Sequence, residues 1–140
     1  MPKPMLDFYD NLEDVIDLKT HDQLLLVGED GIFPNLRRMA GSVALARRSK
    51  ELDSLASAGR SFERIFISRN FVLTELTVRK AAMLSSEDGL ICFVSESEEL
   101  VGAFVEIVER NWPRADVWIC RSNVGAVCMT NARGGAEWQN

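Results

Sequence analysis

The stretch Gln23–Gly28 (QLLLVG) decides the fold class of this 140-residue chain. Its four central residues are all apolar, with no polar residue between them, and the run ends at a glycine. A short apolar run without alternation is typical of a strand that is buried on both faces, as the strands of a parallel sheet are. The sequence therefore predicts a parallel sheet that includes this strand.

Further apolar runs follow this strand, and helical patterns separate them. The sequence ends in two short apolar runs around the loop SNVG, which is typical of a β-hairpin. Ser95 and Ser97 both suit the start of the last helix, and Ser95 with Glu98 fits a capping box. We expect strands at 42–46, 65–68, 90–94, 117–121 and 126–130, helices at 50–58, 72–84 and 95–111, and one or two helical turns at 36–40.

The order of these elements predicts an α/β fold. Strands that alternate with helices form a mostly parallel sheet with helices on both faces, and the terminal hairpin adds antiparallel strands. We therefore expect a three-layer, Rossmann-like sheet in a single domain over residues 1–140. Apolar residues at steps of three and four predict an amphipathic helix within residues 1–20, and residues 132–140 are expected to form a loose tail.

The charge of the chain is unevenly distributed. Residues 1–30 carry a net charge of −6, residues 31–81 carry +6 and residues 82–140 carry −5, which gives −5 in total. An acidic total argues against general nucleic-acid binding. We expect the basic side chains of the middle segment to pair with the acidic flanks or to face water; an anionic ligand is the alternative.

The cysteines and the single histidine give no sign of a metal site or of a disulfide framework. Cys92, Cys120 and Cys128 are odd in number, lack a CxxC spacing and lie among apolar residues, as small buried hydrophobes do. No apolar run is long enough to span a membrane, and the first residues turn acidic where a signal peptide would be apolar. We therefore expect a cytoplasmic protein without a metal. Trp112, Trp118 and Trp138 could form an apolar contact patch or belong to the core.

Three passages, with the order of the elements, resemble the class I S-adenosylmethionine-dependent methyltransferases over residues 22–132. LLLVGEDG (24–31) stands where that family has a glycine-rich first motif. FERIFISRNF (62–71) looks like the later passage where a strand ends beside the reacting methyl group. AAMLSSEDGLICFVSE (81–96) resembles the family's glycine-containing turn and the strand behind it.

The resemblance implies a cofactor site at the carboxyl ends of the strands, where doubly wound sheets bind ligands. The cofactor would be S-adenosylmethionine, and the residues that match the motifs are Gly28, Glu29, Asp30, Gly31, Ser68 and Asn70. The two glycines could equally form a tight turn, because GxxG alone is a weak motif. Asn70 could equally cap the helix at 72–84. The resemblance assigns no catalytic residue.

The sequence also departs from the family's pattern. The first motif has two glycines where three are usual, and Ile32, Phe33 and Pro34 follow them. The acidic residue that normally ends the second strand and holds the cofactor ribose is replaced by Arg47 and Arg48. The chain is also short by roughly one strand–helix unit after the second strand.

These departures favour a methyltransferase-like domain with a degenerate cofactor site, that is, a pseudoenzyme with a binding or scaffold role. Its partner would be a second copy or another protein. The alternative is a small S-adenosylmethionine-dependent methyltransferase with an unknown acceptor. A third hypothesis has the basic middle segment bind a phosphate-bearing ligand at the strand ends, with Arg47 as a contact.

Overall fold

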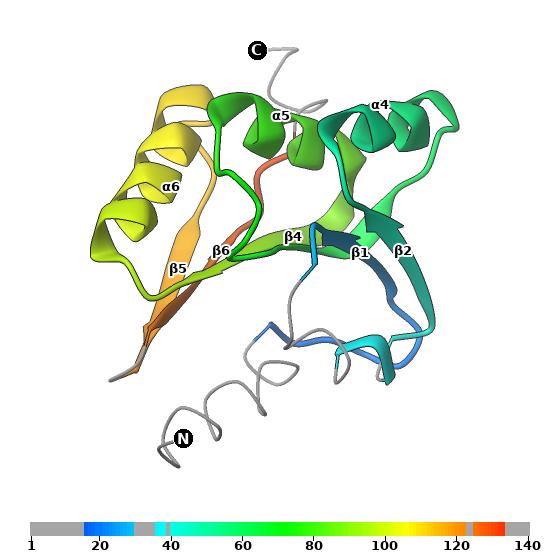
Figure 1. Cartoon of the computed structure of the whole chain (residues 1–140), viewed down its shortest axis with the longest axis horizontal. Coiled ribbons are helices and arrows are strands. Elements are labelled where there is room, and N and C mark those ends of the chain that lie inside the picture. Colours follow the sequence, from blue (N-terminus) through cyan, green and yellow to red (C-terminus); the bar gives the residue numbers. More distant parts are fainter. Residues whose placement is uncertain (1–15, 30–35, 39, 123–124, 134–140) are drawn as a thin grey trace.

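A six-stranded mixed sheet forms the centre of the molecule (Figure 1). The computed structural model describes residues 16–29, 36–38, 40–122 and 125–133. The strand order is β2-β1-β3-β4-β6-β5, in which the first four strands are parallel and the last two are antiparallel to their neighbours. The elements are β1 (Gln23–Val27), β2 (Ser42–Ala46), α4 (Ser49–Ser57), β3 (Phe62–Ile67), α5 (Glu75–Leu84), β4 (Ser85–Ser95), α6 (Glu98–Asn111), β5 (Val117–Arg121) and β6 (Ala126–Thr130).

This architecture confirms the predicted fold class. β2, β5 and β6 have the predicted bounds, and a short helical turn is present at residues 36–38. The part of the predicted N-terminal helix over residues 1–15 lies outside the described residues, as does most of the predicted tail. Residues 16–20 form turns and irregular structure instead of a helix, and Asp17 has a positive φ of 53°. No helix in the described ranges is long and apolar enough to cross a membrane.

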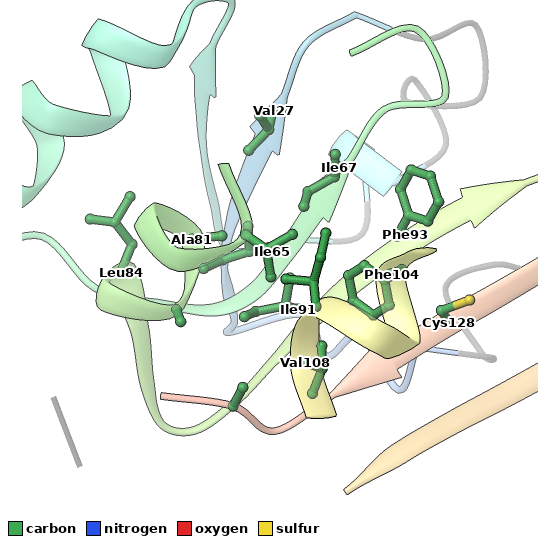
Figure 2. Close-up of a cluster of buried hydrophobic side chains, with 14 of the residues drawn as sticks. Val27, Ile65, Ile67, Ala81, Leu84, Ile91, Phe93, Phe104, Val108 and Cys128 are labelled. Carbon is green, nitrogen blue, oxygen red and sulfur yellow. The ribbon is translucent and has the colours of Figure 1, made fainter. Parts of the chain in front are cut away.

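The sheet buries apolar side chains on both faces, as the uninterrupted apolar strands predict. The helix face is covered by α4, α5 and α6 (Figure 1), and Figure 2 shows the side chains that meet there. The second face carries the alternate strand residues, among them Leu24, Leu26 and Phe66. Ile16 and Leu18 from the segment before β1 and Leu36 from the helical turn pack against it.

β4 begins five residues earlier than predicted. The sequence SSEDG was expected to form a turn after α5, whereas Ser85–Ser95 is one strand. Ser85 pairs with Phe62 of β3, and the register shifts before the regular pairing of Arg64 with Leu90. A Cβ on Gly89 would lie 2.9 Å from the Phe62 carbonyl oxygen and 3.0 Å from the Ser86 amide nitrogen, so the backbone at this irregular point favours a glycine. Turn-forming residues here accommodate a β-bulge rather than a loop.

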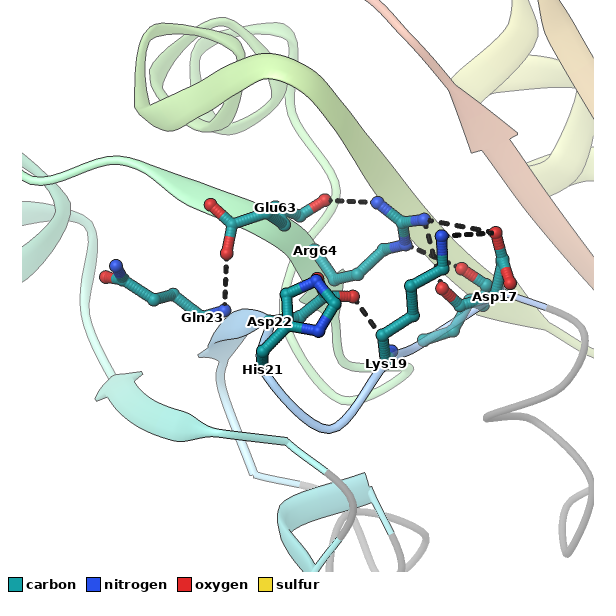
Figure 3. Close-up of polar contacts among 8 residues, drawn as sticks. Asp17, Lys19, His21, Asp22, Gln23, Glu63 and Arg64 are labelled. Carbon is teal, nitrogen blue, oxygen red and sulfur yellow. Dashed lines mark hydrogen bonds and ion pairs between the residues drawn. The ribbon is translucent and has the colours of Figure 1, made fainter.

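One polar cluster holds the segment before β1 on the second face (Figure 3). Arg64 of β3 is 7% exposed, and its guanidinium donates to the Ile16, Asp17 and Glu63 carbonyl oxygens at 2.6, 3.1 and 2.7 Å. The Asp17 carboxylate lies 3.8 Å from the same guanidinium. Arg64 thus contacts the acidic flank, as expected for the basic middle segment, but it does so from a buried position in which backbone carbonyls are its main partners.

Candidate functional site

The topology places a candidate site at the carboxyl ends of β1 and β3. These strands are neighbours, but the chain leaves β1 towards β2 on one side and leaves β3 towards β4 on the other. The two connections diverge at this point, and such a switch in strand order is where doubly wound sheets leave a crevice for a ligand. Gly28 and Glu29 follow β1, and Ser68 to Asn70 follow β3.

Gly28 is required by the neighbouring loop of the protein itself. Its φ is +87°, a conformation that side chains with a Cβ rarely adopt. A Cβ at this position would lie 3.0 Å from Ser68 Cβ and 3.1 Å from Phe71 Cβ. Its amide donates to the Ala46 carbonyl at 2.7 Å and so ties the turn to the end of β2. Both the turn and the close approach of the β3 loop therefore explain this glycine without a ligand.

The backbone of Glu29 is held by the loop after β3. Its carbonyl oxygen accepts hydrogen bonds from Ser68 Oγ at 2.8 Å and from Asn70 Nδ2 at 3.0 Å. Ser68 Oγ in turn accepts from the Asn70 amide at 3.0 Å, and Ser68 is fully buried. These bonds join the two strand ends to each other across the expected crevice.

The side chain of Glu29 points to the end of β2. Its Oε1 lies 2.9 Å from Arg47 Nε in an ion pair whose two side chains are 67% and 61% exposed. An exposed pair of this kind contributes little to stability. It does confirm the expectation that basic residues of the middle segment pair with the acidic flanks, as does the Arg69–Glu96 pair at 3.3 Å.

The structure thus brings Gly28, Glu29, Ser68 and Asn70 together, as their positions at strand ends predict. Asp30 and Gly31 lie outside the described residues, as do Ile32, Phe33 and Pro34. The interpretation of Asn70 as a helix cap is wrong, because α5 begins later and Thr74 Oγ1 caps it by accepting from the Thr77 amide at 3.1 Å. A threonine three residues before a second threonine at the helix start was the signal for this cap.

A second hollow lies at the carboxyl end of β4. It has a volume of about 230 Å³, and the turn of the β5–β6 hairpin forms its other wall. Because β6 is antiparallel to β4, that turn returns to the carboxyl end of β4. α6 begins here. Ser97, one of the two predicted N-caps, caps it by accepting from the Leu100 amide at 3.3 Å, whereas Ser95, predicted to form a capping box with Glu98, lies before the cap. The lining residues are Ser95, Glu96, Ser97, Glu98, Val101, Ser122, Gly125 and Ala126.

A third hollow, of about 380 Å³, lies on the second face beside β2. Val43 and Leu45 line its apolar part, and Arg37 and Arg47 are its charged lining residues. Residues 43, 45 and 47 alternate with buried Ala46 along the chain, so their side chains share one side of the strand. Sequence analysis singled out Arg47 but not Arg37, which comes from the helical turn packed on that side.

The two buried cysteines, Cys92 and Cys128, are not activated nucleophiles. Burial raises the pKa of the Cys92 thiol to about 12 and that of Cys128 to about 11. Both thiols are therefore neutral and unreactive at physiological pH. Cys92 and Cys128 are buried as predicted, whereas Cys120 is half-buried, and all three are free. Within the described ranges, no group of three or more His, Cys, Asp or Glu residues is arranged to hold a metal ion.

Solved structures of known proteins share this architecture. The fold is similar to that of a precorrin-8w decarboxylase from Methanobacterium thermoautotrophicum, at 10% identity over 93% of this chain and 91% of that chain, with a TM-score of 0.65. It is also similar to a precorrin-6y C5,15-methyltransferase from Geobacter metallireducens, at 11% identity over 89% of this chain and 86% of that chain, with a TM-score of 0.63.

A third similar structure was solved with a bound ligand. Human methyltransferase-like protein 13, solved in complex with S-adenosylhomocysteine, matches at 11% identity over 93% of this chain and 80% of that chain, with a TM-score of 0.61. No family model matches the sequence, and no curated protein matches it by sequence. At such low identity the likeness concerns the fold alone. The six-stranded sheet, its strand order and these structural matches show that the chain has the fold of the class I S-adenosylmethionine-dependent methyltransferases.

Proposed function

We propose that this chain is a methyltransferase-like domain with a degenerate cofactor site, which acts by binding a partner rather than by transferring a methyl group. The observation that carries the proposal is the pair of hydrogen bonds from Ser68 and Asn70 to the Glu29 carbonyl. These bonds use the polar groups that the resemblance assigns to the cofactor. They also join the two loops whose separation would create the crevice.

Two further observations on the described residues support this proposal. The space over Gly28, where a ligand could approach the backbone, is taken by the Ser68 and Phe71 side chains. The guanidinium of Arg47 lies at the end of β2, where the family has a ribose-binding acid, and it already pairs with Glu29. A cationic sulfonium near this guanidinium would be repelled. The described residues of the candidate site therefore do not fit S-adenosylmethionine.

Calorimetric titration of the whole chain with S-adenosylmethionine and S-adenosylhomocysteine tests the proposal. We expect no heat of binding from either ligand at millimolar concentration. Micromolar binding that Asp30→Ala abolishes would overturn it and would identify a small S-adenosylmethionine-dependent methyltransferase. Glu87→Ala is the matched control, because this exposed carboxylate lies on β4 before the strand enters the core, far along the chain from the strand ends of the site.

A second candidate function is the binding of a phosphate-bearing ligand in the hollow beside β2. Arg37 and Arg47 provide two guanidinium groups, and Val43 and Leu45 provide an apolar surface for the body of the ligand. Guanidinium groups bind phosphate oxygens in a bidentate manner, and exposed charges make such binding salt-dependent. Titration with inorganic phosphate, followed by NMR, should shift signals of these residues at low salt. Arg37→Gln should reduce the effect, whereas Arg114→Gln, an exposed arginine after α6, should not.

A further inference from the structure

β5 forms one edge of the sheet, beyond β6 and below α6 in Figure 1. Among the described strands it pairs only with β6, and its register with that strand is regular over all five residues. Natural edge strands are usually protected from pairing by prolines, bulges or charges in the middle of the strand. β5 has the sequence VWICR, whose one charge lies at the last position. This edge therefore lacks the usual protection against a further strand.

The backbone groups that point away from β6 follow from the hairpin geometry. The Ser122 amide donates to the Gly125 carbonyl at 2.8 Å, so these two residues form a hydrogen-bonded pair at the hairpin end. Bonded and non-bonded pairs alternate along an antiparallel ladder. Trp118 and Cys120 therefore bond to β6, whereas Val117, Ile119 and Arg121 direct their amides and carbonyls outwards. These three outward residues are spaced symmetrically about Ile119.

The side chains of this edge are apolar and incompletely covered. Trp118 is 46% exposed, which is unusual for the largest apolar side chain, and Cys120 beside it is half-buried. Met129, opposite Trp118 on β6, is also half-buried. The patch of three tryptophans suggested by the sequence does not form, because Trp112 is buried in the core and Trp138 lies outside the described residues. Of the two tryptophans in the described ranges, Trp118 is the exposed one, and it lies on the edge strand.

We infer that β5 pairs with β5 of a second copy of this chain, antiparallel and centred on Ile119, so that the two sheets become one. The outward residues of the two copies then face each other: Ile119 lies opposite Ile119, and Val117 lies opposite Arg121 of the second copy. Each facing pair of outward residues exchanges two backbone hydrogen bonds. The outward backbone groups of residues 117, 119 and 121 are spaced symmetrically about Ile119, so all five residues of β5 can pair in this register. The edge is therefore complementary to itself, as an isologous dimer interface must be.

The side chains also match in this register. Trp118 faces Cys120 of the second copy at a non-bonded position, where side chains approach most closely. No two like charges face each other, because Arg121 lies opposite Val117 and Asp116 opposite Ser122. Arg121 is already neutralised by Glu98 of its own chain at 3.0 Å, and this contact raises the pKa of the guanidinium. The interface therefore covers Trp118 without burying an unpaired charge.

Analytical ultracentrifugation of the whole chain over a wide concentration range tests the inference. We expect the mean mass to rise from 15.7 kDa towards twice that value, and Trp118→Lys to keep it at the monomer value at every concentration. A wild-type chain that is monomeric throughout, or a dimer that Trp118→Lys leaves unchanged, would overturn the inference. The state of the cofactor crevice does not enter this test, so it is independent of the proposed function.

Disulfide trapping tests the register and remains informative if Trp118→Lys is unstable. In a Cys120→Ser background, Ile119→Cys places two thiols on the symmetry axis, at a Cα separation of about 5.5 Å that suits a disulfide. Mild oxidation should give a covalent dimer in high yield. Ala44→Cys, at the centre of the other edge strand β2, is the matched control and should give none. A covalent dimer from Ala44→Cys instead would assign the contact to β2 and contradict the inference.

Discussion

The two faces of the sheet are covered in different ways. The helix face is closed by three helices whose apolar side chains interdigitate with the strands, as Phe93 and Phe104 do in a stacked pair with centroids 5.6 Å apart (Figure 2). In the described residues, the second face is covered by an irregular segment and one helical turn, and the guanidinium of Arg64 bonds the carbonyls of that segment (Figure 3). Apolar packing between helices and strands thus secures the helix face, whereas the cover of the second face combines apolar contacts with the hydrogen bonds of a buried cation.

The largest expected effect is the loss of packing on the helix face. Phe104→Ala removes a fully buried ring from α6 and leaves a cavity against Phe93, which should lower the free energy of unfolding by about 3–5 kcal/mol. Urea unfolding followed by circular dichroism measures this change. Leu100→Ala on the same helix, where the side chain is 40% exposed, should cost less than half as much. Equal losses in both variants would contradict the assignment of Phe104 to the core.

A smaller effect is expected on the second face. Arg64→Met keeps the apolar stem but removes the donors to the Ile16 and Asp17 carbonyls, and should cost about 1–3 kcal/mol because these oxygens lose their partners. Hydrogen exchange should become faster in the amides around residues 16–22 and unchanged in α6. The control Arg114→Met changes an exposed arginine and should leave both quantities unaltered. Faster hydrogen exchange throughout the sheet would show that Arg64 stabilises the whole fold and not only the segment before β1.

The two buried cysteines report on the faces separately, because Cys92 lies on the second face and Cys128 on the helix face. In a Cys120→Ser background, both thiols should resist alkylation at pH 8 in the native state and react in denaturant. Arg64→Met should speed the reaction of Cys92 several-fold more than that of Cys128. Mass spectrometry of the alkylated peptides gives both rates from one sample. Equal acceleration of the two thiols would remove the distinction between the faces.

The smallest effect concerns alkaline pH. The pKa of each buried thiol is raised from 9.0, to about 12 for Cys92 and about 11 for Cys128, by burial in apolar surroundings. The native state therefore holds these protons at pH values where the unfolded chain has released them, so stability falls as pH rises above about 9. Replacement of Cys128 by Ala should flatten the decline between pH 9 and 11 in urea unfolding measurements. An unchanged slope would contradict the raised pKa.

Most of the fold could be predicted from the sequence because its strands are uninterrupted apolar runs. The runs at 24–27, 42–46 and 90–94 carry no polar residue in their buried parts, so their structure depends little on context. The start of β4 could not be predicted in this way. SSEDG has the composition of a turn, and only its pairing with Phe62 across the sheet makes it extended. The local sequence around residue 85 cannot predict a pairing with a strand residue more than twenty positions earlier in the chain.

The candidate site was predictable in position but not in its bonding. Gly28, Glu29, Ser68 and Asn70 could be placed together because each follows a parallel strand. That Ser68 and Asn70 bond the Glu29 carbonyl depends on side-chain conformations that no spacing specifies. The burial of Arg64 and its bonds to backbone carbonyls were missed for a similar reason: an arginine within an apolar strand was grouped with the other basic residues of the middle segment. A cation inside the run FERIFI was itself the signal that buried acceptors lie nearby.

The position of β1 also has a consequence for how the chain acquires its structure. β1 lies between β2 and β3, so the first strand of the described chain obtains its second neighbour only after about forty further residues have been made. The hairpin of β5 and β6, by contrast, closes within a few residues. Pairing between distant residues is slow because the chain loses conformational entropy on closing the loop before the strand contacts form. The parallel half of the sheet should therefore set the folding rate, while the hairpin forms early. Until β3 is made, one edge of β1 has no partner strand from the described chain, and such an unpaired edge is where pairing with another chain starts.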